Sequence, residues 1–450
     1  MFAATVYPED SGSSLMNGKI ELPRETYGQM AMVPGITTVT FFQGDYEEAR
    51  DKLRDRLALI LRSNPWLTGR LVSKVVNVEK QTKIAYLEYS GSLSSLDSFF
   101  DPEGEKPNIK PSMSYSELCK LVGGSICEVP RGSDCIDRDR PLLVLSVVPD
   151  GDYSISGSFA VTFSVSHSII DGYTYYKLLS MLSSDGVISP LNIIPKPDIA
   201  SKTTAAIGEN EKKWSLGWPV IFNVITSIVF GKKPFIENFS LDVNAIEDAK
   251  LKVSSSGSSG QSYVSTNDIV VSKFGKACQS RILLMPINFR KRIADFGDDD
   301  AGNYEGSLLF GPEDYQEPER IRGTLQSGKQ NSNSENMNTS ASIVDSDASV
   351  NKIVAFRRHT ERALPGTWET LRCKIGMVTN WQFPFFSELS IDGCEHMVHI
   401  PCSNVTITPF DLGIVYRPRA NETALVACVR SAKLDQFTRI MPFTLKKNLV

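Results

Sequence analysis

The stretch FSVSHSIIDGY, residues 163–173, combines the residue types of a general base and its support. His167 follows an apolar run, Asp171 comes four residues later, and Gly172 stands directly after it. A neutral imidazole titrates near neutrality, so it can take a proton from a hydroxyl or an amine that attacks an acyl carbon. The stretch therefore indicates proton-transfer chemistry at His167.

The residues alone leave the role of Asp171 open. Its carboxylate could orient the imidazole of His167, or it could turn away and hold the loop through an arginine. Gly172 would allow a sharp turn or a close approach by another group. A further interpretation gives the motif no chemistry, since His167 could be a hydrogen-bonded core residue in a strand-to-helix turn.

The segments around the motif are expected to hold it in place. Residues 142–149 are almost continuously apolar, which is typical of a buried strand. Residues 158–167 alternate between apolar and small or polar side chains, so they predict a second strand with His167 continuing its apolar face. Residues 173–184 predict a helix. The motif would thus occupy the turn between a strand and a helix.

The rest of the chain predicts an α/β protein. Residues 36–42, ITTVTFF, predict a strand, and Asp45 with Glu48 three residues later matches the start of a capped helix. Residues 265–279 predict another helix start, and residues 281–289 predict a further strand. Mixed helices and strands therefore lie on both sides of the motif.

Composition narrows the function classes. The formal net charge of −4 over 450 residues gives no basic footprint, so we expect no nucleic-acid partner. The first residues lack the basic and apolar regions of a secretory signal. The eight cysteines are therefore expected to be reduced thiols in a cytoplasmic protein.

Three stretches interrupt the pattern of helices and strands. Residues 195–213 are rich in proline, lysine and alanine and are interpreted as a crossover linker. Residues 218–231, WPVIFNVITSIVFG, are apolar but shorter than the roughly 20 residues that span a bilayer. A buried helix is expected there, with a peripheral membrane contact as the less favoured alternative. Residues 327–349 are rich in serine and asparagine and predict a disordered surface loop.

The stretch CEHMVHIPC, residues 394–402, places two cysteines and two histidines close together. Zinc ligands have to converge on one tetrahedral centre. If the stretch is a strand, its ends lie about 26 Å apart at ~3.3 Å per residue, and the four side chains do not converge. We therefore interpret it as a strand and expect no metal site.

The order of several motifs resembles that of the BAHD acyltransferases. It is also similar to the wider superfamily of chloramphenicol acetyltransferase and the condensation domains of peptide synthetases. The strand, turn, strand, HxxxDG and helix arrangement around His167 carries most of the resemblance. Ser166 stands where those two other branches usually have a second histidine, so the BAHD-like branch fits better. The other matching stretches are TTVTFF with NPWLTGRL, YVSTNDIVVSKF, MPINFRKRI with AGNYEG, VTNWQFPFF, and the closing VYRPRANETALVACVRSAKLDQFTRIM.

The resemblance implies an acyltransferase with His167 as general base toward an acceptor hydroxyl or amine, and no covalent acyl-enzyme. Acyl-CoA would be the donor and a cosubstrate, and no cofactor would be permanently bound. Asp171 would be structural and paired with Arg290, with Arg292 as the second choice. Gly172 would provide room beside the histidine.

Three further residues match positions of the family. Thr379 and Trp381 occupy its Thr-x-Trp segment, and Thr379 could hydrogen-bond the developing oxyanion, an effect of ~3–4 kcal/mol in other acyl-transfer enzymes. Asn303 lies in the Gly-Asn segment and is expected near the channel. Ordinary packing is the alternative role for all three.

One segment departs from the plant members of the family. Residues 387–396 read SELSIDGCEH where those enzymes carry Asp-Phe-Gly-Trp-Gly. The departure leaves the mode of CoA binding open, and a carrier-protein thioester remains an alternative donor. A catalytically silent binding protein on the same scaffold is the alternative from another class.

The fold implied is α/β, with two chloramphenicol-acetyltransferase-like lobes of mixed sheet plus helices and an active-site channel between them. Residues 1–195 would form the N-terminal lobe, residues 196–240 the crossover linker with the apolar segment, and residues 241–450 the C-terminal lobe. A monomer that takes acyl-CoA and a small-molecule acceptor is expected.

Overall fold

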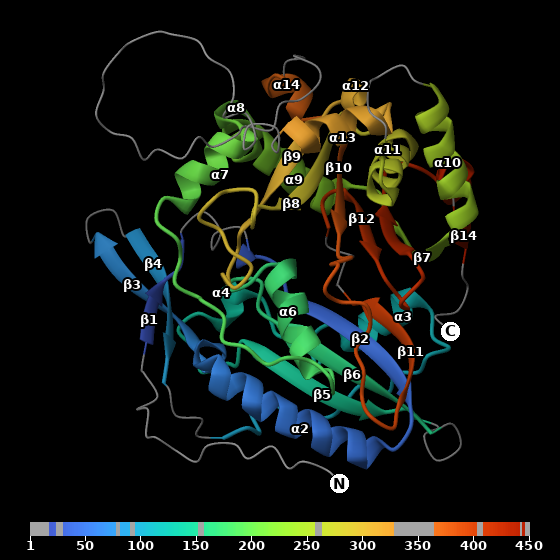
Figure 1. Cartoon of the computed structure of the whole chain (residues 1–450). Coiled ribbons are helices and arrows are strands. Elements are labelled where there is room, and N and C mark those ends of the chain that lie inside the picture. The colour runs from blue at the N-terminus through green and yellow to red at the C-terminus, as the bar shows by residue number, and fades with distance from the viewer. Residues whose placement is uncertain are drawn as a thin grey trace, which may run out of the picture.

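The computed structural model describes residues 18–23, 30–77, 82–90, 95–151, 157–256, 263–327, 364–402, 408–441 and 443–445. Within them, two larger sheets occupy opposite halves of the molecule, each with helices packed on it (Figure 1). From residue 328 on, the loop expected at 327–349 lies outside the described residues. The α/β architecture expected from the sequence is confirmed.

The first sheet is antiparallel and has the strand order β11-β2-β6-β5. All eight residues of β6 are buried, including the serines and the threonine that alternate with its apolar side chains. The strand therefore lies in the interior with both faces covered. It ends at Val165, two residues earlier than expected, so His167 belongs to the following turn and does not continue the apolar face of the strand. The bounds are β2 Ile36–Gln43, β5 Leu143–Pro149, β6 Ser158–Val165 and β11 Glu395–Pro401.

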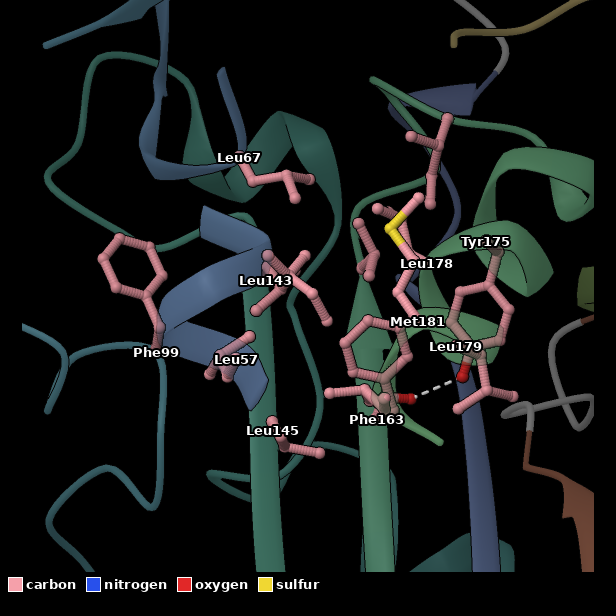
Figure 2. Packing of buried hydrophobic residues seen from close by; sticks show 14 of the residues in the cluster. Leu57, Leu67, Phe99, Leu143, Leu145, Phe163, Tyr175, Leu178, Leu179 and Met181 are labelled. Atoms are coloured by element: carbon pink, nitrogen blue, oxygen red, sulfur yellow. Dashed lines mark hydrogen bonds between the residues drawn. The ribbon is translucent and has the colours of Figure 1, made fainter. Parts of the chain in front are cut away.

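Two helices pack against each other beside this sheet. In α2, Tyr46–Ser63, the Asp45 carboxylate accepts a hydrogen bond from the Glu48 backbone N–H at 3.0 Å, which confirms the expected N-terminal cap. The second helix, α6, spans Gly172–Leu182 and contacts α2. Figure 2 shows Leu57 of α2 and Leu178 of α6 in the cluster that also holds Leu143 and Phe163 of the sheet.

Two polar contacts of one buried tyrosine position α6 on the sheet. The hydroxyl of Tyr175 donates to the Phe163 carbonyl at 2.8 Å (Figure 2). The same hydroxyl lies 2.8 Å from the Thr38 hydroxyl. Because Tyr175 is fully buried, these partners hold the first turn of α6, and with it the HxxxDG turn, at a fixed place over the strands.

The second sheet has the order β14-β7-β13-β12-β10-β8-β9 and is mixed, because β10 runs parallel to both of its neighbours. Helix α11 begins where a helix start was predicted, with a capping box between Ser265 and Asp268. The strands are β7 Phe235–Leu241, β8 Ile282–Asn288, β9 Glu305–Phe310, β10 Ile375–Asn380, β12 Asp411–Tyr416, β13 Ala424–Val429 and β14 Phe443–Leu445. The helices of this half are α10 Val243–Ser256, α11 Thr266–Cys278, α12 Pro312–Tyr315, α13 Pro318–Ser327, α14 Thr367–Thr370 and α15 Leu434–Ile440.

A third, smaller sheet has the order β1-β4-β3, and its β3 and β4 form the antiparallel hairpin that the alternation over 71–90 predicts. Its strands are β1 Gly18–Glu21, β3 Arg70–Asn77 and β4 Thr82–Tyr89. The remaining short elements of the first half are η1 Pro65–Thr68, α3 Tyr115–Val122 and α4 Gly132–Cys135.

Sheet membership does not follow the boundary drawn at residues 240–241. Strand β11 comes from the C-terminal part of the chain, yet it pairs antiparallel with β2 of the first sheet. A buried cluster continues this link, because Val39 of β2, Ile400 of β11 and Ile414 of β12 belong to one core. The two halves are therefore joined by a shared strand and a shared core, which composition along the chain does not reveal.

The segment between the halves is more structured than a linker, and one expectation about it is wrong. It contains α7 Ile199–Ile207, α8 Glu209–Ser215 and α9 Trp218–Phe230. Helix α9 forms where the apolar run predicts a helix, but it is not buried: only Val220 and Asn223 of its residues are. An apolar run predicts burial, whereas the fold covers only one side of this helix.

Candidate active site

His167 lies in the turn that connects β6 to α6. Its side chain is 19% exposed, while its Nδ1 atom is buried. The backbone carbonyl of His167 accepts a hydrogen bond from Asn303 Nδ2 at 2.9 Å. Because Asn303 precedes β9 of the second sheet, this bond ties the histidine turn of one half to the other half. With Nδ1 buried, Nε2 is the ring nitrogen left to face a reacting group.

Asp171 caps α6. Its Oδ1 accepts hydrogen bonds from the backbone N–H and the hydroxyl of Thr174, each at 2.9 Å. Its own backbone N–H donates to the Gly302 carbonyl at 3.2 Å. Gly302 has a backbone φ of +129°, a conformation that favours glycine, so this carbonyl position depends on residue 302 being glycine.

The structure pairs Asp171 with Arg290, the first of the two arginines considered from the sequence. Arg290 Nη1 donates to Asp171 Oδ2 at 2.6 Å, and the exposed fractions of the two side chains are 0% and 1%. The Arg290 guanidinium also donates to the carbonyls of Asp300 and Gly302, at 2.8 and 3.1 Å. The backbone N–H of Tyr304 is a further donor to Asp171 Oδ2, at 2.9 Å. Both charges are thus fully hydrogen-bonded, as a buried pair requires.

These contacts decide between the two roles left open for Asp171. The partners of its carboxylate are Thr174, Arg290 and Tyr304, and the imidazole of His167 is not among them. The carboxylate has turned away from the histidine and holds the turn through the arginine. The ring centroids of Tyr173 and Tyr304 lie 4.6 and 4.9 Å from the Arg290 guanidinium carbon, so both rings also contact this cation.

One residue beside the histidine was missed in the sequence. Glu305 Oε1 lies 3.8 Å from His167 Nε2, and the Glu305 side chain is 25% exposed. Burial raises the pKa of Glu305 above its usual range, and the neighbouring His167 opposes that rise. Glu305 lies in the stretch AGNYEG, two residues after the candidate Asn303. This closeness in the sequence could have identified it.

Gly172 is the first residue of α6, and its surroundings are open. A Cβ atom placed there would meet only Phe383 Cζ, at 3.8 Å. Among the described residues, therefore, no side chain fills the space beside Gly172. Near it lies an aromatic group in which Tyr173 contacts the rings of Phe383 and Phe385, with centroids 5.7 and 5.0 Å apart.

Thr379 and Trp381 stand at the end of β10, in the other half. Thr379 is half-buried and pairs in register with Ile414 of β12. The indole of Trp381 packs against the first core and the shared core, and its ring lies 6.2 Å from that of Tyr176 on α6. Trp381 thus packs as the alternative role considered for it requires, and within the described part of the chain no hydrogen bond, ion pair or ring contact joins either residue to His167.

The stretch 394–402 forms strand β11, as expected, and it contains the buried histidine His399. His399 is buried between the hydroxyls of Thr40 and Tyr176, at 2.8 and 3.1 Å from its two ring nitrogens. Burial lowers the pKa of His399 to about 3. Among the described residues no group of three histidine, cysteine or carboxylate side chains could hold a metal ion.

Comparison with known proteins identifies the fold. No family model and no curated protein sequence matches the chain. Among solved structures, polyketide synthase associated protein 5 from Mycobacterium tuberculosis has a TM-score of 0.57 at 15% identity, over 94% of this chain and 97% of that one. TRI101 from F. graminearum, complexed with coenzyme A and deoxynivalenol, has a TM-score of 0.56 at 11% identity, over 95% and 99%. Vinorine synthase has a TM-score of 0.51 at 13% identity, over 98% and 96%.

These likenesses extend over nearly the whole chain at low identity, so they establish a shared fold. They confirm, at the level of the fold, the resemblance that the order of motifs indicated.

Proposed function

We propose that this chain, which has the two-lobed fold of the BAHD-like acyltransferases and the chloramphenicol acetyltransferase superfamily, transfers an acyl group from acyl-CoA to a hydroxyl or amine of a small molecule. His167 is the general base in this proposal. We further propose a cytoplasmic, monomeric enzyme with acyl-CoA as cosubstrate and no permanently bound cofactor. Coenzyme A complexes of TRI101, on the same fold, support the choice of donor.

The observation that carries the proposal is the way His167 is held. A turn fixed by the buried Asp171–Arg290 pair presents a partly exposed imidazole at the place where β6–α6 of one half meets the β8–β9 hairpin of the other. The buried His399, by contrast, has both ring nitrogens within hydrogen-bonding distance of protein hydroxyls. An imidazole held on a rigid support and accessible to the reacting group is what general-base catalysis requires.

The proposed reaction needs only one proton carrier. The acceptor's oxygen or nitrogen attacks the thioester carbon while Nε2 of His167 takes the acceptor's proton, which leaves a tetrahedral oxyanion. When that intermediate collapses, the carbon–sulfur bond breaks and the imidazolium returns the proton to the leaving thiolate. Thr379 is the proposed donor to the oxyanion, and Glu305 faces the imidazole on the nitrogen that gains the proton.

The side chains near the open space at Gly172 suggest the character of one substrate. Phe383, Phe385 and Tyr173 form an aromatic surface there, and Phe385 is 40% exposed. Aromatic rings favour apolar and planar groups over charged ones. We propose that an apolar portion of the acyl group or of the acceptor lies against this surface, next to Gly172.

The test measures free thiol release from a panel of acyl-CoAs offered with pooled alcohols and amines. Wild-type protein should release CoA, and the His167→Gln variant should lose about 10²–10⁴-fold in kcat, the usual contribution of a general base. Thermal unfolding of the variant at the wild-type temperature is the control that its fold is intact.

Three outcomes would redirect or overturn the proposal. Release from an acylated carrier protein, with none from any acyl-CoA, would assign the donor to a carrier-protein thioester. No release from either donor class by a folded wild-type protein would favour a catalytically silent binding protein. Equal rates in wild type and the His167→Gln variant would remove His167 from the mechanism.

A further inference from the structure

Helix α9 exposes a continuous apolar face. Its residues Trp218, Ile221, Phe222, Ile225 and Val229 follow the spacing of one side of a helix, and they are 62%, 52%, 51%, 52% and 62% exposed. Phe230, at the end of the helix, is 83% exposed. Single exposed apolar residues are ordinary, but a contiguous face of this size marks an interaction site.

The opposite side of α9 is fixed to the protein. Asn223 is buried, and its Nδ2 donates to the carbonyls of Thr370 and Cys373 at 2.7 and 3.1 Å. Val220 is also buried, and α14 contacts the helix. Figure 1 shows α8, α9 and α14 in the half of the molecule that contains the second sheet. The helix is therefore held along one side, and only its other side is available.

The exposed face offers almost no hydrogen-bonding groups. The two hydroxyls of α9 donate within the helix itself, from Thr226 to the Phe222 carbonyl at 2.9 Å and from Ser227 to Asn223 Oδ1 at 3.4 Å. The thirteen residues of α9 include no charged side chain. A protein partner forms roughly one hydrogen bond per 100–200 Å² of interface, whereas the acyl region of a bilayer requires none.

Cationic side chains stand at the border of this face. Lys232 and Lys233 follow the helix directly, and both are exposed. Neither ammonium forms an ion pair within the described part of the chain. Arg372, next to the segment that binds Asn223, is exposed as well. On the preceding helix α8, the Glu209 carboxylate pairs with Lys213 at 2.9 Å.

We propose that the exposed face of α9 binds the surface of a membrane that contains anionic phospholipid. The apolar side chains enter the boundary between headgroups and acyl chains, and Lys232 and Lys233 contact the phosphates, as in helices that lie in the membrane plane. Trp218 at the other end of the helix fits the headgroup level, where an aromatic ring with one polar atom is favoured.

The structure favours a helix that lies on the membrane over one that crosses it. By length and composition alone, the segment Glu209–Phe230 could span a bilayer. It is interrupted at Leu216–Gly217, where α8 ends and α9 begins. A spanning helix would also have to withdraw Asn223 and Val220 from their buried positions, and would place Glu209, Glu211 and two lysines in the same span.

Vesicle co-sedimentation tests the proposal on the full chain, with vesicles of phosphatidylcholine alone and of phosphatidylcholine with phosphatidylserine. Wild-type protein should sediment with the anionic vesicles. The double variant Phe222→Asp, Ile225→Asp should lose about tenfold or more in bound fraction. The double variant Lys232→Glu, Lys233→Glu should lose the preference for phosphatidylserine, and high salt should have the same effect. Val187→Asp, at an 83% exposed apolar residue elsewhere, is the matched control and should bind as wild type does.

Three results would overturn the proposal. Wild-type protein could stay in the supernatant with every vesicle, or the Phe222→Asp, Ile225→Asp variant could bind as strongly as wild type. In the third result, light scattering would show that the wild-type protein is a dimer and this variant a monomer, and the wild-type protein would not bind vesicles. The exposed face of α9 would then be an interface between two copies. Because every readout is binding or mass, the result does not depend on the proposed acyl transfer.

Discussion

At the scale of single residues, the site combines a rigid support with one unusual neighbour. Asp171 and Arg290 pair with each other, and among the described residues no carboxylate bonds to Nδ1 of the His167 imidazole. Glu305 stands instead near Nε2. A carboxylate in this position would stabilise the imidazolium that forms when the histidine takes a proton, and it would have to be ionised to do so.

Replacing Glu305 by glutamine tests this role. We expect Glu305→Gln to lower kcat/KM about tenfold, which corresponds to ~1.4 kcal/mol of transition-state stabilisation. Wild-type activity should fall as the pH drops through the raised pKa of Glu305, and the variant should lose that part of its pH dependence. The pH profile of kcat/KM measures both effects.

Stability provides the control for this variant. Because the folded-state pKa of Glu305 is raised, its contribution to stability is present below the unfolded pKa and is lost as the pH rises through the folded pKa. Above that range Glu305→Gln should therefore unfold at a higher temperature than wild type. A variant that loses both activity and stability at alkaline pH would indicate a structural role.

The Asp171–Arg290 pair operates between elements, because it joins the N-terminus of α6 to the hairpin of β8 and β9. Removing one partner leaves a buried charge without compensation, which costs roughly 3–5 kcal/mol. We expect Asp171→Asn and Arg290→Met each to reduce the free energy of unfolding by about that amount, as measured by denaturant titration.

A double-mutant cycle separates the pair from its other contacts. The variant with both substitutions should cost clearly less than the sum of the two single changes, since neither charge then remains buried alone. Additive costs would mean that the two side chains act independently, through Thr174 on one side and Gly302 on the other.

His399 connects β11 to β2 and to α6, and it predicts how stability depends on pH. Its pKa is lowered to about 3 in the folded protein, so the unfolded chain binds a proton that the folded protein excludes. The contribution of neutral His399 to the free energy of unfolding should thus be fully present above a pH of about 6.5. It should be lost as the pH falls toward the folded pKa, by up to roughly 5 kcal/mol.

The variant His399→Gln keeps polar atoms near Thr40 and Tyr176 but cannot gain the charge. We expect it to be less stable than wild type at neutral pH, and to show a smaller loss of stability between neutral pH and pH 4. Denaturant midpoints measured across this range compare the two proteins. If the stability of the variant fell with pH as steeply as that of wild type, groups other than His399 would cause the acid sensitivity of the fold.

At the scale of the whole molecule, the two halves are not independent. Strand β11 of the C-terminal part covers the edge of β2, and the shared core includes side chains of β2, β11, β12 and β13. We expect a single cooperative transition in scanning calorimetry of the full chain, because neither half buries its core alone. Two resolved transitions would contradict this.

A fragment ending at residue 240 extends this prediction. It lacks β11, so β2 would become an exposed and apolar edge strand. We expect the fragment to aggregate or remain unfolded, whereas a fragment that folds reversibly would show that the first sheet is complete without β11. Circular dichroism and light scattering distinguish these outcomes.

The features that could be predicted from the amino-acid sequence are local. The strand at 36–42, the cap of α2 at Asp45 and the capping box of α11 were predictable, because each depends on residues a few positions apart. The order of motifs along the chain also indicated the two-lobed fold and placed His167 at the end of a strand, next to the turn in which the structure has it.

Only the tertiary structure decided the features that join distant segments. The partner of Asp171 is 119 residues away, Glu305 reaches His167 from the other half, and β11 leaves its neighbours in sequence to pair with β2. The exposure of α9 belongs here too, because apolar composition predicts a preference for burial, while the surrounding fold determines which side of a helix is covered.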